Sequence, residues 1–322
     1  MFKLPLILFL NAVFSTDGTD SPIIGVLSQE TYSIRKYLKD EESAKSFIAA
    51  SYVKYLESAG ARVVPIWIGQ ELDYYERLIN YTNGAIFPGG ATYFTEPKGY
   101  GETASIIYKL AVEANKNGKY YPLWGTCLGM EVFAFAILNE DIRTNCDLHK
   151  VAVPVHFVNG YENSKLLSQT PQEIIQILRT KNVTYNYHRY CLTEAVIKKH
   201  GLDKEWKILS TNKDEHGEEF VSMMESTKQP FYGVQFHPEK SPFEFKNNYG
   251  IPHCRDSIRV AQYFANFFVD ECRKSKNNFP DSNLEKISLI YNYQTTYTGL
   301  NGSSYEQIYF FTQEDFNKNQ LK

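Results

Sequence analysis

This 322-residue chain lacks two common metal-binding patterns and any bias of charge. Neither C-x-x-C nor H-E-x-x-H spacing occurs, so the sequence gives no reason to expect a zinc site. The 34 Lys and Arg residues against 37 Asp and Glu give a net charge of −3, which predicts no basic face for nucleic acid. Beyond the N-terminal segment, no apolar run is long enough to predict a transmembrane helix.

The N-terminus has the features of a secretory signal peptide. Lys3 precedes an apolar run from Leu4 to Phe14, and small Ser15 follows at the expected cleavage point. We therefore expect residues 1–15 to be removed and 16–322 to form the mature, soluble protein; an uncleaved N-terminal strand is the alternative. In a secreted chain, three N-x-S/T sequons become candidate glycosylation sites on exposed loops: Asn80, Asn182 and Asn301.

Cysteine is scarce and odd in number, with five residues. In an oxidising compartment at least one must stay unpaired within the chain. Cys127 is expected to be the free one, because a nucleophile in a disulfide cannot react. The other four allow three pairings, or they stay as buried thiols: Cys146, Cys191, Cys254 and Cys272.

The segment from Trp124 to Met130, with Cys127 between Gly125 and Gly129, follows an apolar strand-like run. Glycines two residues to either side suit a sharp strand-to-helix turn that exposes a nucleophile above a sheet. Cys127 is therefore the candidate nucleophile. At a helix start beside an imidazolium, its pKa is expected to be lowered. A buried structural cysteine in a tight turn is the alternative reading.

A second motif supplies the base. The run from Tyr232 to Lys240 ends in His237 and Glu239, two residues apart. In an extended chain, side chains at i and i+2 lie on one face, so the carboxylate can accept a hydrogen bond from one imidazole nitrogen. Together with Cys127 this predicts a nucleophile, a base and an orienting acid. A histidine at a strand end with a structural role is the alternative.

Strand-like and helical segments alternate along much of the chain, which predicts a mostly parallel central sheet with helices on both faces and a site at the carboxyl ends of its strands. No composition shift marks a boundary, so we predict a single α/β domain. Strands are expected at 22–27, 62–68, 84–87, 121–124, from 231 and at 286–297, and helices from about 43 to 60 and at 72–79, 103–115 and 256–272.

Acyl transfer also needs donors for the developing oxyanion. The backbone N–H of Leu128, next after the nucleophile, is the first candidate. The second is Gly90, or its neighbour Gly89, in the turn that closes the strand at 84–87. A plain surface turn is the alternative for these glycines.

Three blocks carry a resemblance to the class I glutamine amidotransferase-like superfamily, which has a flavodoxin-like fold. They are Phe87–Gly90, Trp124–Gly129 and Gly233–Lys240. Within it, Ala49–Pro65 and Asn186–His188 closely resemble the gamma-glutamyl hydrolase family. The resemblance extends over nearly the whole mature chain.

The resemblance implies a secreted and lysosomal peptidase, usually a homodimer, that cleaves γ-glutamyl bonds of folyl- and antifolyl-poly-γ-glutamates without a cofactor. It implies Cys127 as nucleophile, His237 as proton donor, Glu239 as its orienter and His188 on the substrate side. The residues alone allow a stand-alone glutaminase or amidotransferase subunit, because glutamine offers the thiolate the same carbonyl. A non-catalytic binding protein on the same fold is a third alternative. A single domain in an exported chain favours water as the acceptor.

Overall fold

The computed structural model describes residues 18–37 and 44–318, so the predicted signal peptide lies outside the described residues. A central sheet has the strand order β3-β1-β4-β5-β11-β10-β9-β7. The first five strands run parallel and the last three are antiparallel additions, which confirms the mostly parallel sheet. The strands are β1 (Ile23–Leu27), β3 (Arg62–Ile66), β4 (Gly84–Phe87), β5 (Leu123–Thr126), β7 (His156–Phe157), β9 (Trp206–Lys213), β10 (Glu219–Ser226) and β11 (Phe231–Val234).

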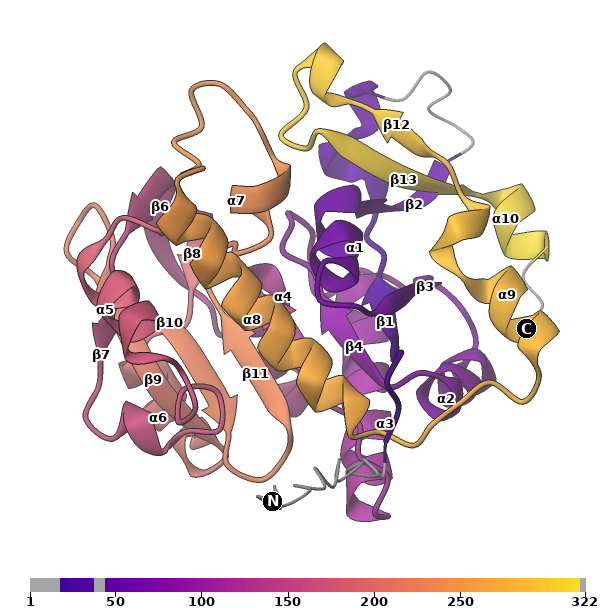
Figure 1. Ribbon diagram of the computed structural model, residues 1–322, viewed down its shortest axis with the longest axis horizontal. Helices are drawn as coiled ribbons and strands as arrows, with labels where there is room; N and C mark the ends of the chain where they lie inside the picture. The colour runs from indigo at the N-terminus through magenta and orange to yellow at the C-terminus, as the bar shows by residue number, and fades with distance from the viewer. Residues whose placement is uncertain (1–17, 38–43, 319–322) are drawn as a thin grey trace, which may run out of the picture.

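Helices cover both faces of this sheet (Figure 1). One layer packs α1, α5, α7 and α8 together and the other packs α2, α3 and α4, each over its own hydrophobic cluster. The first layer comprises α1 (Ala50–Glu57), α5 (Gln172–Thr180), α7 (Lys240–Phe243) and α8 (Arg255–Arg273). The second comprises α2 (Leu72–Tyr81), α3 (Tyr100–Lys116) and α4 (Leu128–Leu138). The remaining α-helices are α6 (Glu194–Lys199), α9 (Ser282–Ser288) and α10 (Gln313–Lys318).

Two small sheets flank the central one. The first contains β2 (Ala44–Ala49), β12 (Thr295–Tyr297) and β13 (Gln307–Thr312), and the second pairs β6 (Thr144–Val153) with β8 (Thr184–Cys191). A buried disulfide between Cys146 and Cys191 joins β6 to β8. It settles the pairing that the sequence left open, because Cys254 and Cys272 are free thiols, as is Cys127.

Two predicted elements are wrong in part. The helix expected from residue 43 begins only at Ala50, because Ala44–Ala49 is strand β2 and pairs with distant β13. The backbone of Phe47 also exchanges two hydrogen bonds of 2.9 Å with that of Gln29. The strand expected at 286–297 is strand only over β12, because Asp281 caps the preceding helix α9.

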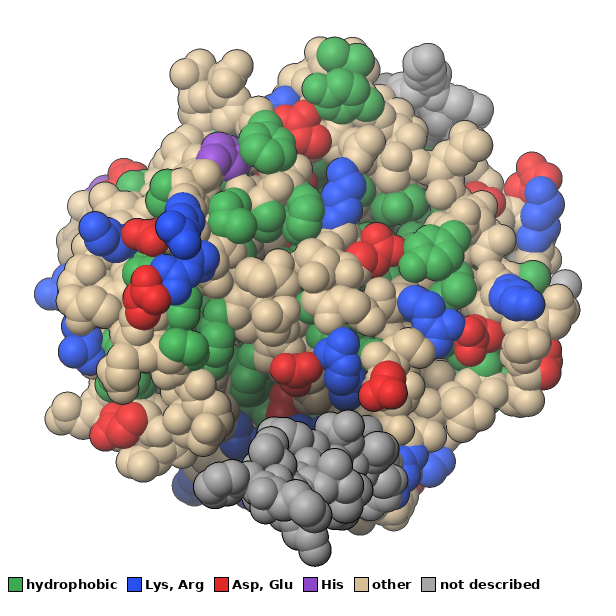
Figure 2. All heavy atoms as spheres, in the orientation of Figure 1, with side chains coloured by type: hydrophobic (Ala, Val, Ile, Leu, Met, Phe, Trp, Pro, Cys, Tyr) green, Lys and Arg blue, Asp and Glu red, His purple; other side chains and the backbone are tan. Residues whose placement is uncertain are grey.

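The surface carries charges of both signs. On the face drawn in Figure 2, basic and acidic side chains are interspersed.

The three sequon asparagines are exposed: Asn80, Asn182 and Asn301. Asn80 lies in the last turn of α2 and not in a loop. Over residues 18–37 and 44–318, no helix combines the length and apolarity needed to cross a membrane.

Candidate active site

Four adjacent parallel strands end at one edge of the sheet and bring the predicted residues together. Gln29 follows β1, Gly89 follows β4, Cys127 follows β5 and His237 comes soon after β11. This is the edge where ligands bind in parallel α/β sheets.

The nucleophile elbow requires its glycines. A Cβ at Gly125 would lie 2.2 Å from the carbonyl oxygen of Gly129, and one at Gly129 would lie 1.8 Å from that of Phe87. Between them Cys127 has φ 52° and ψ −113°, a conformation that is strained for a residue with a side chain. Its N–H donates to the Val234 carbonyl at 2.7 Å, so the surrounding structure holds the strained turn in place.

His237 and Glu239 form the predicted pair. His237 Nδ1 lies 2.8 Å from Glu239 Oε1, and both residues are buried. A carboxylate only accepts, so Nδ1 carries the proton and Nε2 has a free lone pair. The chain turns into α7 at Glu239 instead of staying extended, with φ −66° and ψ −20°, yet the contact forms.

Cys127 and His237 approach one point from two strands. A Cβ placed on Gly89 would lie 2.6 Å from His237 Cε1 and 3.1 Å from Cys127 Cβ. The absence of a side chain at Gly89 therefore lets the imidazole and the cysteine converge. The backbone N–H of His237 donates to the Tyr185 carbonyl of β8 at 2.8 Å, which anchors the histidine segment.

The resting protonation state differs from the sequence-based expectation. Burial raises the pKa of Cys127 well above its ordinary value, and Glu131 adds to this, although the Leu128 N–H opposes it. Burial also lowers the pKa of His237, against the pull of Glu239. The pKa of Glu239 is held low by His237 in spite of burial. The pair therefore rests as a neutral thiol and a neutral imidazole beside an ionised carboxylate.

One of the predicted oxyanion donors lies at the sulfur. The Leu128 N–H faces the Cys127 sulfur, whereas the N–H groups of Met130 and Glu131 bond the Cys127 carbonyl. The Gly89 N–H donates to the Tyr52 hydroxyl at 2.8 Å.

The side chain of Gln29 holds the loop that carries the second predicted donor. Gln29 Nε2 donates to the Gly89 carbonyl at 2.8 Å and lies 3.3 Å from that of Pro88. Of the two glycines predicted for this role, Gly90 is the one whose N–H has no acceptor among the described residues.

His188 lies on β8 near the pair. It is 6% exposed, and its Nδ1 lies 3.2 Å from the Cys146 carbonyl oxygen, which can only accept. Its Nε2 is buried and has no hydrogen-bond partner among the described residues. Burial, followed by the neighbouring His237, lowers the pKa of His188 to about 4. His188 is thus a neutral ring with an unused acceptor.

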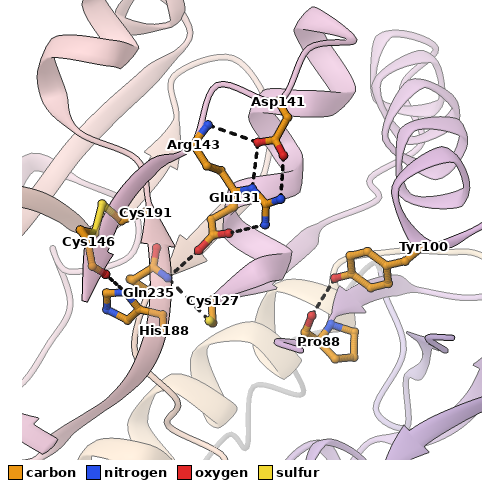
Figure 3. A network of polar contacts seen from close by, with 10 residues as sticks. All are labelled: Pro88, Tyr100, Cys127, Glu131, Asp141, Arg143, Cys146, His188, Cys191 and Gln235. Carbon is orange, nitrogen blue, oxygen red and sulfur yellow. Dashed lines mark hydrogen bonds and ion pairs between the residues drawn. A yellow bond between two sulfur atoms is a disulfide. The ribbon is translucent and has the colours of Figure 1, made fainter. Parts of the chain in front are cut away.

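Several site residues escaped the sequence analysis. Gln235 Nε2 lies 3.6 Å from Cys127 Sγ and donates to Glu131 Oε1 at 2.8 Å (Figure 3). The buried Lys240 ammonium lies 4.6 Å from the centre of the Tyr305 ring. Gln235 and Lys240 stand in the same block as His237, which is the only local signal for them. Within the described ranges, no three His, Cys, Asp or Glu residues gather as they would around a metal ion.

The mostly parallel sheet, the cysteine elbow and the His-x-Glu pair are the parts of an α/β peptidase with a cysteine nucleophile. The peptidase C26 family model matches residues 22–239. The chain belongs to this family.

Its curated relatives carry one activity in their names. The human gamma-glutamyl hydrolase is 40% identical over 92% of this chain and 91% of its own length. Gamma-glutamyl hydrolase B of Dictyostelium discoideum is 35% identical over 100% of this chain and 94% of its own. Among solved structures, PurLQS from Thermotoga maritima has a TM-score of 0.46 at 12% identity, covering 77% of this chain and 99% of that one.

Proposed function

We propose that this enzyme hydrolyses the γ-glutamyl bonds of folyl- and antifolyl-poly-γ-glutamates through a thioester on Cys127. The observation that carries the proposal is the convergence of Cys127 and the His237–Glu239 pair beside Gly89. Relatives named gamma-glutamyl hydrolase over almost the whole chain support the choice of bond.

The first half-reaction follows from the resting protonation state. As Cys127 Sγ attacks the γ-carbonyl carbon, its proton passes to His237 Nε2, and Glu239 stabilises the imidazolium through Nδ1–H. The carbonyl oxygen becomes an oxyanion between the N–H groups of Leu128 and Gly90. The C–N bond then breaks, and His237 returns the proton to the leaving amine.

The second half-reaction regenerates the enzyme. Water attacks the thioester and gives a proton to His237, and collapse of the tetrahedral intermediate returns the proton to the departing Cys127 sulfur. This step releases the shortened folate, whose last glutamate residue now has a free γ-carboxyl group, and no step needs a cofactor. His188 Nε2, an acceptor without a partner, suits a substrate N–H at the edge of the site.

Product analysis tests this function against an amidotransferase. The enzyme and a pentaglutamyl folate should give shorter folates and glutamate by mass spectrometry, with little ammonia from glutamine. Cys127→Ala should lose turnover by a factor of about 10⁴ or more, because it removes the covalent nucleophile. Ammonia release from glutamine that is faster than glutamate release from the folate would instead favour a glutaminase. Full turnover by Cys127→Ala would show that Cys127 is not the nucleophile.

We further propose that the enzyme acts in lysosomes or outside the cell as a homodimer. The buried Cys146–Cys191 disulfide supports an oxidising route. N-terminal sequencing of secreted protein should begin at about residue 16, and light scattering should give twice the mass of one chain. An N-terminus at residue 1 or a monomeric mass would contradict the respective part.

A further inference from the structure

A buried ion cluster lies behind the nucleophile. The Glu131 side chain is 3% exposed and that of Arg143 is 9% exposed, with Arg143 Nη1 3.3 Å from Glu131 Oε2. Arg143 Nε donates to Asp141 Oδ1 at 2.8 Å, and Arg143 Nη2 donates to Asp141 Oδ2 at 2.7 Å. Buried charges are costly and rarely contribute net stability, so such a cluster one helical turn from Cys127 points to a role in the site.

Aromatic rings hold the Arg143 guanidinium in place. Its central carbon lies 4.0 Å from the Phe94 ring centre and 4.9 Å from that of Tyr190. Phe94 follows the loop that carries Gly90, and Tyr190 lies on the strand that carries His188. With two aromatic rings beside it and three nitrogens bonded to carboxylates, the Arg143 guanidinium is a fixed charge and is not available to bind substrate.

Gln235 links this cluster to the sulfur (Figure 3). Its Nε2 donates to Glu131 Oε1 at 2.8 Å and lies 3.6 Å from Cys127 Sγ. Its Oε1 is buried and has no partner among the described residues. The hydrogen bond to Glu131 is therefore the shorter of the two contacts that orient the Gln235 amide.

The charge of Glu131 decides whether the NH₂ group or the oxygen of the Gln235 amide faces the Glu131 carboxyl group. An ionised carboxylate only accepts, so it faces the NH₂ group, whereas a protonated one can donate to Oε1 and allow the amide to turn over. Burial raises the pKa of Glu131, and Arg143 is the main group that opposes this, with Gln235 assisting. Asp141 acts in the opposite direction, so Arg143 is the positive charge that opposes the effect of burial on Glu131.

We propose that Arg143 is a positioning residue for the nucleophile: it keeps Glu131 ionised, Glu131 fixes the Gln235 amide, and Gln235 Nε2 steadies the Cys127 sulfur. The inference deepens the proposed function and rests on Cys127 as its nucleophile. Besides Glu131, the charged groups that act on Cys127 are Glu239 and Lys240, both on the His237 side.

Alkylation of Cys127 by iodoacetamide at a series of pH values tests the proposal without relying on turnover. The parent carries Cys254→Ser, because Cys254 is exposed and the Ser257 N–H lowers its pKa, so it would react as well. Modification is followed by mass spectrometry of the Cys127 peptide. The variants are Arg143→Met, Arg143→Lys, Glu131→Gln and the Arg143→Met/Glu131→Gln double variant, and kcat and KM are measured for each.

Arg143→Met should lower kcat about tenfold and change KM less, because the Cys127 sulfur is misplaced while the groups that bind substrate are unchanged. Its alkylation profile should gain a titration that the parent lacks, because without Arg143 the burial of Glu131 raises the pKa of its carboxyl further. Arg143→Lys should restore part of the loss. The double variant should match Glu131→Gln, because without the Glu131 charge Arg143 has no link to the Gln235 amide.

A profile for Arg143→Met that matches the parent would overturn the inference. So would a difference of more than about threefold between Glu131→Gln and the double variant. That second comparison holds even if Arg143→Met fails to fold, because the double variant leaves no unpaired Glu131 charge in the cluster. If alkylating Cys127 leaves turnover intact, the proposed function fails as well, which separates the two failures.

Discussion

Two neighbouring buried histidines differ in the group that their Nδ1 atoms contact most closely. His237 Nδ1 lies 2.8 Å from the Glu239 carboxylate, whereas His188 Nδ1 lies 3.2 Å from the Cys146 carbonyl. They are 5% and 6% exposed, respectively, and burial lowers the pKa of each. Burial therefore does not distinguish them, and the partner does.

The partner determines what each ring can do. A carboxylate stabilises an imidazolium, so in the proposed mechanism His237 accepts the thiol proton when Cys127 attacks. A carbonyl fixes a neutral tautomer but supplies no full charge, so in the same proposal His188 is an acceptor through Nε2. The comparison teaches that the group in contact with Nδ1 decides whether a buried histidine can act as a base or only as a neutral acceptor.

The largest expected effect separates the two histidines directly. His237→Asn should lower kcat by about 10³- to 10⁴-fold, because the proton of Cys127 loses its acceptor. His188→Asn should cost about 10²-fold at most, since no proton moves through that ring. Both values come from steady-state kinetics on the pentaglutamyl folate. Equal losses in the two variants would remove the distinction between base and acceptor.

Removing the carboxylate should make His237 resemble His188. Glu239→Gln keeps an oxygen that accepts from Nδ1–H but loses the charge, so kcat should fall about 10²-fold. Glu239 raises the pKa of His237, so its loss should also move the acid limb of kcat/KM to lower pH. The pH profile checks the sign of this change. A limb that stays in place would show that the charge of Glu239 does not reach the ring.

The lowered pKa of His188 predicts a pH-dependent stability. The pKa of His188 falls from 6.5 to about 4 on folding, so between these pH values the unfolded chain binds a proton at His188 and the folded protein does not. The free energy of unfolding should fall as pH drops below 6.5, with a loss on the order of 2 to 3 kcal/mol by about pH 4. Urea unfolding at both ends of this range measures it. His188→Gln should lack this component, and an identical pH dependence in that variant would contradict the prediction.

Local signals account for the parts of the site that the sequence revealed. The elbow around Cys127 and the His237–Glu239 pair need only neighbours along the chain. Strand β2 did not emerge because its partner β13 is more than 250 residues away, and apolar Ala44, Phe47 and Ile48 also fit helical spacing.

The protonation of the nucleophile is a tertiary property as well. A helix start predicted a low pKa for Cys127, but burial and the carboxylate of Glu131 raise its pKa instead. Likewise, Arg143 is connected to Cys127 through Glu131 and Gln235, a route that no spacing in the sequence encodes.

The smallest expected effect concerns a contact that His237 has and His188 lacks. The Tyr52 hydroxyl accepts from the Gly89 N–H at 2.8 Å and lies 3.4 Å from His237 Nδ1. Tyr52→Phe leaves the Gly89 N–H without its acceptor and should lower kcat about three- to tenfold. Tyr55→Phe is the matched control, because the Tyr55 hydroxyl is buried one helical turn away without a hydrogen-bond partner among the described residues. Steady-state kinetics of the two variants decide the matter. Equal rates would mean that the Tyr52 contact contributes packing alone, and that Glu239 by itself sets His237 apart from His188.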